Sequence, residues 1–276
     1  MEYSPASFKH KIDKNDFKIK KYYGQNFISD ENVIDKIVDK SDIDKDTLVI
    51  EIGPGIGSLT YKLALKAGFV QCYEIDDKLK PILNDNLKNV DNFNIEFKDF
   101  LSCDVKDDLK KYDFKKVSVV ANLPYYITTP IILKIIEDQI NVDKIVVMVQ
   151  KEVGDRFKAL PNTKDYGSLS VYLNYYYEIR KLMDVSRNIF VPKPNVDSIV
   201  VEFRKKENRF LLKDDNIFFK LIKDSFKQKR KTLKNNLKDY DLDKVNEVLF
   251  KHKMDLSVRA EQLSIDIFVE IANNLN

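Results

Sequence analysis

Histidine and cysteine are scarce in this chain of 276 residues, which has two of each. His10 and His252 lie outside the segments that hold the other candidate site residues, so a Ser-His hydrolase or a His-ligated zinc site is not expected. Cys72 and Cys103 lack metal-ligand spacing and are expected to be small buried thiols in a reducing compartment rather than a disulfide.

Long apolar runs are also missing. No stretch approaches the roughly 20 apolar residues that a membrane-spanning helix needs, and residues 1–21 contain no apolar core of a secretory signal. We therefore expect a cytoplasmic protein with no membrane partner. With 43% hydrophobic residues, the chain can bury the core of one large domain, or of a large domain and a smaller one.

Charge is unevenly distributed, although the formal net charge is only +3. The net charge is +3 over residues 1–21, −4 over residues 22–204 and +4 over residues 205–276. A basic excess at both ends fits a polyanionic partner, but solvated lysine-rich surfaces explain it equally well. Charge alone leaves the partner open.

Apolar runs alternate with amphipathic stretches through the first two thirds of the chain, which predicts an α/β fold with a parallel, doubly wound sheet. The expected strands are residues 47–52, 70–75, 93–97, 117–122 and 144–150. Two longer strand-like stretches, residues 170–183 and 197–204, could add an antiparallel edge. The later pattern is helical, as in residues 215–226, 241–250 and 264–275. We expect two domains: residues 1–206 with a basic N-terminal arm, and residues 207–276, all helical.

Glycine is rare, and three of the seven glycines fall in "EIGPGIG". Gly53, Gly55 and Gly57 follow an expected strand and precede an expected helix, the context in which a glycine-rich turn lets the backbone approach a ligand. The dinucleotide fingerprint needs glycine where this chain has Ser58, and the Gly-Lys-Ser/Thr ending of a P-loop is absent. A tight turn without a ligand is the plainer alternative.

Acidic residues accompany the ends of the expected strands. Glu51 precedes the glycine loop, Glu74 could accept both hydroxyls of a ribose, and Asp99 could accept a hydrogen bond from an adenine amino group. Each acid alone is more often a solvent-facing residue. Together they predict a pocket for an adenosine group without phosphates, as in S-adenosylmethionine.

The fourth expected strand runs into "NLPYYITTP". The Asn122 side-chain oxygen and the Leu123 carbonyl could accept both hydrogens of an exocyclic amine, so that its lone pair faces a methyl donor. Pro124 restricts Leu123 to an extended conformation, and Tyr125 offers a flat face for a base taken out of its stack. Without the glycine loop, a turn residue at a strand end would be the favoured interpretation of Asn122.

Seven stretches then occur in order: "YYGQNFISD", "EIGPGIGSLT", "YEID", "NLPYYITTP", "FVPKPNVDSIV", "FKQKRKTLKNNL" and "RAEQLS". They resemble the motifs of the bacterial KsgA-type small-subunit ribosomal RNA adenine N6,N6-dimethyltransferases, from about residue 18 to the C-terminus. The resemblance implies a Rossmann-like methyltransferase domain followed by a helical domain. It also implies S-adenosylmethionine-dependent dimethylation of two adjacent adenines in the 3′-terminal hairpin of 16S ribosomal RNA during ribosome biogenesis.

The resemblance also implies roles for individual residues. Contacts to the cofactor are implied for Asn26, Ile28, Gly53, Gly55, Glu74, Asp99 and Asn122. Contacts to the target base are implied for Asn122, Leu123, Pro124 and Tyr125, with Phe190 stacking on the other face of the base. A monomer without metal, acting on ribosomal RNA within an assembling 30S particle, is expected.

A basic stretch occupies residues 227–234, where five of eight residues are basic. Lys227, Lys229, Arg230, Lys231 and Lys234 fit a helix that contacts the RNA backbone. Lys229 stands where the family often has arginine, so it keeps the charge and loses the bidentate fork. Tyr126 replaces an asparagine found in some members and should be tolerated beside the base.

Three alternatives stay open. The large-subunit adenine methyltransferase of macrolide resistance shares the cofactor loop, but "KRKTLKNNL" and "RAEQLS" favour the small-subunit enzyme. A non-catalytic RNA-binding assembly or transcription factor would tolerate loss of the glycine loop or of Asn122, and both are present. A small-molecule methyltransferase has no evident need for a basic helical appendage.

Overall fold

The computed structural model describes residues 5–15, 17–207 and 211–276. Residues 1–4 and 16 of the expected basic arm, and residues 208–210 beside the expected domain boundary, lie outside the described residues. The chain divides into two compact units: Met1–Gly154 with Arg180–Arg204, and Asp155–Ile179 with Lys205–Asn276. The sequence boundary at residues 206/207 differs from this division, because residues 155–179 group with the C-terminal helices.

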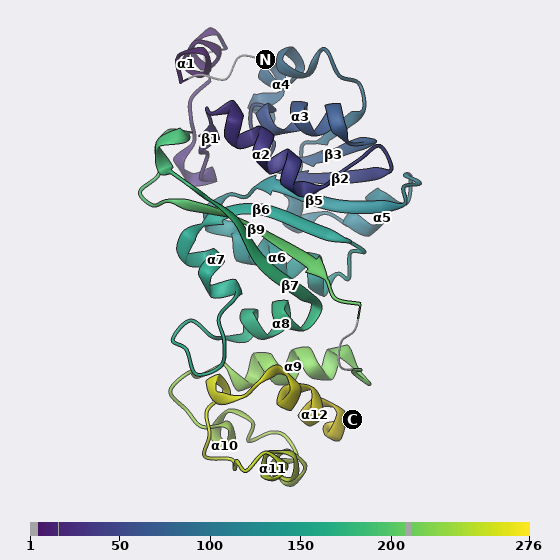
Figure 1. The fold of residues 1–276 in the computed structure, drawn as a ribbon, viewed down its shortest axis with the longest axis vertical. Helices are drawn as coiled ribbons and strands as arrows, with labels where there is room; N and C mark the ends of the chain where they lie inside the picture. The colour runs from purple at the N-terminus through teal and green to yellow at the C-terminus, as the bar shows by residue number, and fades with distance from the viewer. Residues whose placement is uncertain (1–4, 16, 208–210) are drawn as a thin grey trace. The chain divides into compact units, whose positions relative to one another are not determined.

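A seven-stranded sheet forms the centre of the first unit within the described residues (Figure 1). In spatial order its strands are β4 (Phe93–Glu96), β3 (Phe69–Tyr73), β2 (Thr47–Ile52), β5 (Lys116–Asn122), β6 (Lys144–Gln150), β9 (Ser198–Lys205) and β7 (Tyr177–Val185). The strands from β4 to β6 are parallel, whereas β9 pairs antiparallel with β6. The five predicted parallel strands and the antiparallel edge are confirmed.

Helices cover both faces of this sheet, as a parallel sheet requires. They are α2 (Glu31–Ser41), α3 (Ser58–Lys66), α4 (Lys80–Leu87), α5 (Val105–Leu109), α6 (Thr128–Glu137) and α7 (Lys151–Phe157). Figure 1 shows α2 and α3 in front of the sheet and α6 behind it. In α2, Asp30 caps the first turn by accepting hydrogen bonds from two backbone N–H groups, and Ile34, Ile37 and Val38 are buried at helical spacing.

The N-terminal segment joins the first unit through a second, small sheet. After α1 (Pro5–Lys14) and the 3-10 helix η1 (Lys21–Tyr23), strand β1 (Phe27–Ile28) pairs antiparallel with β8 (Phe190–Val191). The 3-10 helix η5 (Arg187–Ile189) precedes β8, and its last carbonyl accepts hydrogen bonds from the Ser29 backbone N–H and hydroxyl at 2.8 and 2.7 Å. This pairing fixes the segment that follows Gln25 beside the sheet.

The second unit is mostly helical. It contains α8 (Ser168–Tyr176), α9 (Asp215–Ser225), α10 (Leu233–Asn236), α11 (Leu242–Lys251), the 3-10 helix η6 (Ala260–Gln262) and α12 (Ile265–Leu275). Phe218, Leu221 and Phe268 are fully buried in its core. The three helices predicted after residue 207 are confirmed, with ends that differ by one residue.

Residues 170–176 are helical, so the strand predicted over residues 170–183 is wrong in its first half. Tyrosine and valine favour strands, but packing against α9 decides the conformation here. The Tyr172 hydroxyl donates to the Phe219 carbonyl at 2.6 Å, and the Tyr175 ring lies 4.8 Å from that of Phe218. The same contacts explain why residues 155–179 group with the C-terminal helices.

Short 3-10 helices sit where several strands end. They are η2 (Asp77–Leu79), η3 (Phe100–Ser102) and η4 (Tyr125–Ile127). The sequence "TTP" predicts Thr129 as the N-cap of the next helix, but η4 runs directly into α6, which begins at Thr128 with Ile127 as its N-cap. The Thr128 hydroxyl instead donates to the Pro124 carbonyl at 3.1 Å, so it stabilises the turn after β5.

The described residues also bear on two expectations, one about membrane-spanning helices and one about the cysteines. Among the helices of residues 5–15, 17–207 and 211–276, none is long and apolar enough to cross a membrane. Cys72 and Cys103 are free and buried, so the expectation of buried thiols is confirmed.

Candidate functional site

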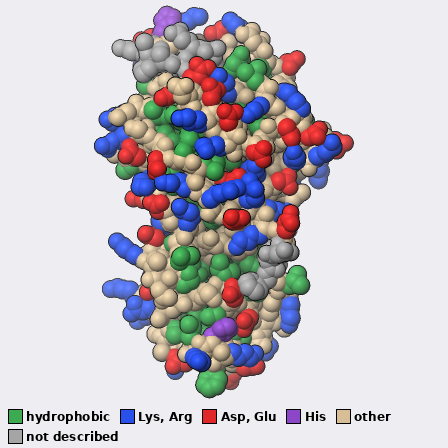
Figure 2. Space-filling view, in the orientation of Figure 1, with side chains coloured by type: hydrophobic (Ala, Val, Ile, Leu, Met, Phe, Trp, Pro, Cys, Tyr) green, Lys and Arg blue, Asp and Glu red, His purple; other side chains and the backbone are tan. Residues whose placement is uncertain are grey.

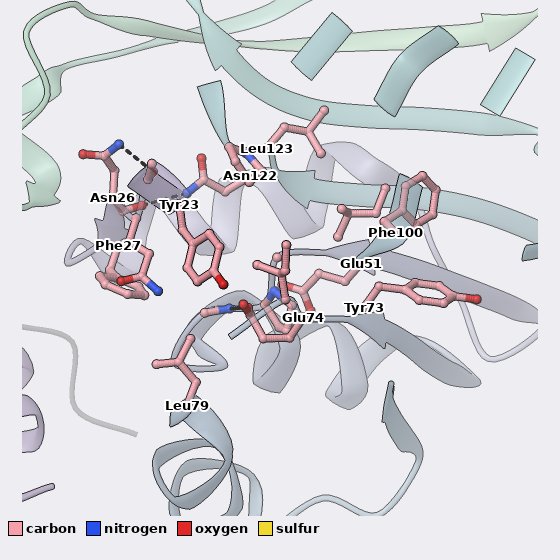
Figure 3. Close-up of a pocket in the computed structure, with 18 of the residues that line it drawn as sticks. Tyr23, Asn26, Phe27, Glu51, Tyr73, Glu74, Leu79, Phe100, Asn122 and Leu123 are labelled. Atoms are coloured by element: carbon pink, nitrogen blue, oxygen red, sulfur yellow. Dashed lines mark hydrogen bonds between the residues drawn. The ribbon is translucent and has the colours of Figure 1, made fainter. Parts of the chain in front are cut away.

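One pocket of the first unit lies at the carboxyl ends of the parallel strands, where open α/β sheets bind ligands. It is lined by the turns after β2, β3, β4 and β5 and by residues 23–28 of the N-terminal segment. Figure 3 shows Asn26, Asn122, Glu51 and Glu74 around this space. Ten of the predicted site residues line it: Asn26, Ile28, Gly53, Gly55, Glu74, Asp99, Asn122, Leu123, Pro124 and Tyr125.

The glycine loop forms one wall of the pocket in a conformation that other residues rarely adopt. Gly53, Gly55 and Gly57 have φ angles of 72°, 61° and 82°. A Cβ atom on Gly55 would also lie 2.9 Å from the Phe27 ring, which is too close. The Gly55 N–H donates to Glu74 Oε2 at 3.1 Å, so the loop presents its backbone to the carboxylate that the sequence places in the same pocket.

Glu74 is buried directly after β3, and only 5% of its surface is exposed. Burial raises its pKa to about 7, and hydrogen bonds from the Asp76 and Gly55 backbone N–H groups partly offset that effect. The Asp76 N–H lies 2.9 Å from Oε1 and the Gly55 N–H is bound to Oε2. Both oxygens are therefore fixed in orientation, and each retains a further lone pair for a ligand hydroxyl.

Glu51 lies on β2 beneath the pocket and is almost completely buried. Burial raises its pKa to about 8, and the neighbouring Thr60 hydroxyl and Cys72 thiol lower it by a smaller amount. The Cys72 Sγ atom lies 3.7 Å from Glu51 Oε2. Near neutral pH this carboxyl group therefore keeps its proton for most of the time, unlike an exposed glutamate.

Asp99 follows β4 and caps η3, where its Oδ1 accepts a hydrogen bond from the Leu101 N–H at 3.0 Å. Its side chain also lines the pocket between Lys98 and Phe100. The cap fixes the carboxylate at the edge of the space, on the side of β4. This placement agrees with the sequence expectation that acids at consecutive strand ends share one pocket.

Asn122 ends β5, and its amide is held in one orientation. Its Nδ2 donates to the backbone carbonyl of Asn26 at 3.0 Å (Figure 3). Its Oδ1 is buried and accepts no hydrogen bond from any residue in the described part of the chain. A buried acceptor without a donor costs about 1–3 kcal/mol. Such a cost is expected where a ligand supplies the missing donor.

The residues after Asn122 are held by separate contacts. The Leu123 N–H donates to the Met148 carbonyl at 3.1 Å, which continues the pairing of β5 with β6 for one residue. Pro124 has φ −58° and ψ 127°, and it gives the chain a sharp turn into η4. The Tyr125 hydroxyl and the Ser198 hydroxyl lie 2.6 Å apart, so the half-buried Tyr125 ring has a fixed position beside Asn122.

Phe190 is the predicted site residue that the structure does not bring to the pocket lining. It is 3% exposed and packs in the core cluster that contains Ile34 and Val120. Its backbone pairs with that of Ile28, which does line the pocket. Stacking of Phe190 on a base stays a prediction that would require its side chain to leave this core.

The five basic residues of the RNA-binding prediction are all exposed. They lie in the second unit, on the connection from α9 to α10 and on α10 itself, rather than on one continuous helix. The predicted helix is therefore wrong, because α9 ends at Ser225 and α10 spans only Leu233–Asn236. On the face of the first unit drawn in Figure 2, basic and acidic side chains are interspersed, so charge there does not mark one binding surface.

Sequence reasoning missed several pocket residues. Tyr23, Gln25, Phe27 and Lys98 line the pocket, and the sequence indicates no role for them at the cofactor or base; Tyr126, expected beside the base, lines it as well. The stretch "YYGQNFISD" contains three of them, but the motif gave no reason to place Tyr23 or Gln25 beside Glu74. Among the described residues, no group of three or more His, Cys, Asp or Glu side chains could hold a metal ion.

Known proteins resemble this chain over nearly all of its length. The model of the family described as "Ribosomal RNA adenine dimethylase" matches residues 16–276. The Ribosomal RNA small subunit methyltransferase A of Bacillus pumilus (strain SAFR-032) is 45% identical over 281 residues, which cover 99% of this chain and 96% of that protein.

Solved structures also share the fold. A dimethyladenosine transferase from Plasmodium falciparum has a TM-score of 0.73 and 25% identity, and the match covers 89% of this chain and 95% of that one. The 23S rRNA methyltransferase ErmE has a TM-score of 0.66 at 24% identity, covering 91% and 99% of the two chains, which shows the fold alone. The family match and the close curated relative together show that this chain belongs to the ribosomal RNA adenine dimethylase family.

Proposed function

We propose that this protein uses S-adenosylmethionine to dimethylate N6 of two adjacent adenines in the 3′-terminal hairpin of small-subunit ribosomal RNA. Membership of the adenine dimethylase family and the names of the curated relatives support an RNA adenine substrate. Asn122 supports the chemistry most directly, because it lines the pocket and its buried Oδ1 accepts no hydrogen bond within the described part of the chain. We further propose that the protein acts as a monomer on an assembling 30S particle.

The pocket fits the cofactor by its donor and acceptor groups. Glu74 would accept the ribose hydroxyls, since both of its oxygens are oriented by backbone N–H groups. Asp99 would accept the adenine amino group, and the Gly53 to Gly57 turn lets the backbone lie close to the ligand. Asn26 and Ile28 would close the pocket from the N-terminal segment. When bound, the sulfonium supplies an already activated methyl group.

The chain's own residues would prepare the target amine. An exocyclic amine of adenine is a weak nucleophile because its lone pair is delocalised into the ring. Asn122 Oδ1 and the Leu123 carbonyl would accept its two hydrogens and favour the geometry in which the lone pair faces the methyl donor. The fixed Tyr125 ring would receive the flipped base. No strong general base is required, because the proton can leave after transfer.

The second unit would supply the contacts to the RNA backbone. Five exposed cations lie within the eight residues that connect α9 to α10 and begin α10. Cations at this density bind phosphates largely without regard to sequence, so they position the RNA rather than select the base. Selection of the adenine would come from the pocket in the first unit.

A methylation assay tests the proposed function. We expect the purified protein to transfer methyl groups from S-adenosylmethionine to small subunits that lack the modification, and not to fully modified ones. Mapping of the modified nucleotides should find N6,N6-dimethyladenine at two adjacent positions. Strong transfer to naked large-subunit RNA with none to small subunits would instead support the macrolide-resistance activity, and RNA binding without transfer would support the non-catalytic factor.

Asn122→Ala should remove turnover while measurable cofactor binding remains. The variant loses the unpaired acceptor, and loss of one such group in a transition state costs about 100-fold or more in rate. Asn94→Ala is a suitable control, because Asn94 lies on β4 and bonds Gln71 and Glu96 outside the pocket lining. Single-turnover methyl transfer and calorimetric titration with cofactor measure the two effects, and unchanged turnover would remove the role proposed for this amide.

Cofactor affinity should rise with pH through about 7. The ribose hydroxyls need an ionised carboxylate as acceptor, and burial raises the Glu74 pKa in the ligand-free protein to about 7. Below that pH the carboxyl must lose a proton to bind, so affinity should fall by up to about tenfold per pH unit. Glu74→Gln should bind more weakly with a flatter profile between pH 6 and 8. Parallel profiles for the two proteins would assign the pH dependence to another group.

A triple variant should weaken RNA binding and flatten its salt dependence. It changes Lys229, Arg230 and Lys231 together to Ala. Each lost phosphate contact reduces the slope of log K against log salt by about one. A matched variant changes Lys244, Lys251 and Lys253, which are exposed residues on or next to α11, and removes the same charge. Filter binding at several salt concentrations compares the two, and equal slopes would make the α9–α10 connection an ordinary solvated surface.

A further inference from the structure

Asp76 is a buried carboxylate for which neither the proposed chemistry nor the motif comparison gives a role. It follows Glu74 by two residues, and its side chain has no exposed surface. A buried charge is retained only where partners compensate for the lost hydration. The Lys78 backbone N–H donates to Asp76 Oδ1 at 3.3 Å, so the side chain caps η2. Its two side-chain partners come from the N-terminal segment that closes the pocket.

Two side chains of that segment bind the two oxygens of Asp76. The Lys20 Nζ donates to Oδ1 at 2.7 Å, and the Gln25 Nε2 donates to Oδ2 at 2.9 Å. The Lys20 backbone N–H donates in turn to Gln25 Oε1 at 2.8 Å, which fixes the orientation of the glutamine amide. Lys20, Gln25 and Asp76 are called the acid clasp below. Because both carboxylate oxygens accept bonds, an amide at position 76 could not satisfy the clasp.

The acid clasp connects two parts of the pocket lining, Glu74 and Asn26. On one side, the Asp76 backbone N–H donates to Glu74 Oε1 at 2.9 Å. On the other, Gln25 directly precedes Asn26, whose carbonyl accepts the hydrogen bond from Asn122 Nδ2 at 3.0 Å. The clasp therefore joins the carboxylate expected at the ribose to the residue that orients the amide expected at the target amine.

The N-terminal segment from Lys20 to Ser29 is held at both of its ends. After Asn26, β1 pairs with β8, and Ser29 donates two hydrogen bonds to the Ile189 carbonyl. Before Asn26, the Lys20 ion pair and the Gln25 hydrogen bond hold the segment to Asp76. The pairing of β1 with β8 thus restrains the chain after Asn26, and the clasp restrains it before Asn26. Together they limit the movement of the Asn26 carbonyl.

We propose that Asp76 is a positioning residue for methyl transfer: through Lys20 and Gln25 it holds the Asn26 carbonyl in place and thereby orients the Asn122 amide. This inference rests on the proposed function. The clasp acts on orientation, so its loss should lower the rate of transfer at saturating cofactor more than it lowers cofactor affinity. Cofactor affinity should fall too, though less. The clasp also holds the Asp76 backbone, whose N–H donates to Glu74 Oε1.

The test compares single-turnover methyl transfer, cofactor dissociation constants and amide hydrogen exchange of residues 23–28. Asp76→Asn, Lys20→Met and Gln25→Ala should each slow transfer at saturating cofactor by about tenfold, the usual effect of a lost charge-assisted hydrogen bond. Each should also speed exchange of residues 23–28 in the cofactor-free protein. Lys20→Arg, which keeps the charge, should restore most of the rate.

Lys62→Met is the matched control. Lys62 is as buried as Lys20, with 18% against 20% of the side chain exposed, and it pairs with Glu31 and Asp35 on the outer surface of α2 and α3. This variant should leave the rate and the exchange of residues 23–28 unchanged. Because Lys20→Met and Gln25→Ala leave the buried carboxylate in place, they test the clasp even where Asp76→Asn does not fold.

Two further results separate the clasp from simple loss of stability and from the proposed function. The double variant Lys20→Met with Gln25→Ala should be no slower than Asp76→Asn, since all three residues form one unit. Unchanged rates at saturating cofactor in all clasp variants, or an equal loss in Lys62→Met, would overturn the inference. If the wild type transfers no methyl group, the proposed function fails, while hydrogen exchange still reports whether the clasp orders residues 23–28.

Discussion

The hydrogen bond from Asn122 Nδ2 to the Asn26 carbonyl is the interaction on which the geometry of the site depends. An asparagine amide can rotate to present either its donor or its acceptor, and among the described residues the hydrogen bond to the Asn26 carbonyl fixes which one it presents. The bond joins residues that are 96 positions apart in the chain. It can therefore form only when both the central sheet and the N-terminal segment have reached their final positions.

Burial of charge is the second constraint, and it explains the shape of the glycine loop. Glu74 sits in a space where water cannot solvate it fully, so its ionised form depends on backbone donors. Gly55 supplies one of these donors from a backbone with positive φ, directly against the Phe27 ring. Glycine is needed at this position both for the conformation and for the space. The rarity of glycine elsewhere made the loop visible in the sequence.

The central sheet could be predicted because its strands are local and apolar on both faces. Residues 47–52 and 144–150 read as buried strands and form β2 and β6 with the same ends. Residues 170–176 could not be assigned in this way, since valine, leucine and tyrosine suit a buried strand as well as a buried helix. Their helix depends on Phe218 and Phe219 of α9, which are distant in sequence.

The pocket residues could be predicted where a strand ends and not where a distant segment closes over them. Glu74 and Asn122 lie at the ends of predicted strands and Asp99 lies just beyond one, so their meeting at one edge follows from parallel topology. The contacts of Lys20 and Gln25 with Asp76 could not be predicted in this way, because they depend on the path of the N-terminal segment. Neither residue stands out in the sequence, since lysine is abundant and a single glutamine carries no pattern. For Phe190 the motif predicts a contact with the base, whereas the structure buries the side chain. Its backbone pairing with Ile28 accounts for this burial. The strand ends thus determine which chemical groups face the pocket, and the N-terminal segment determines how they are oriented.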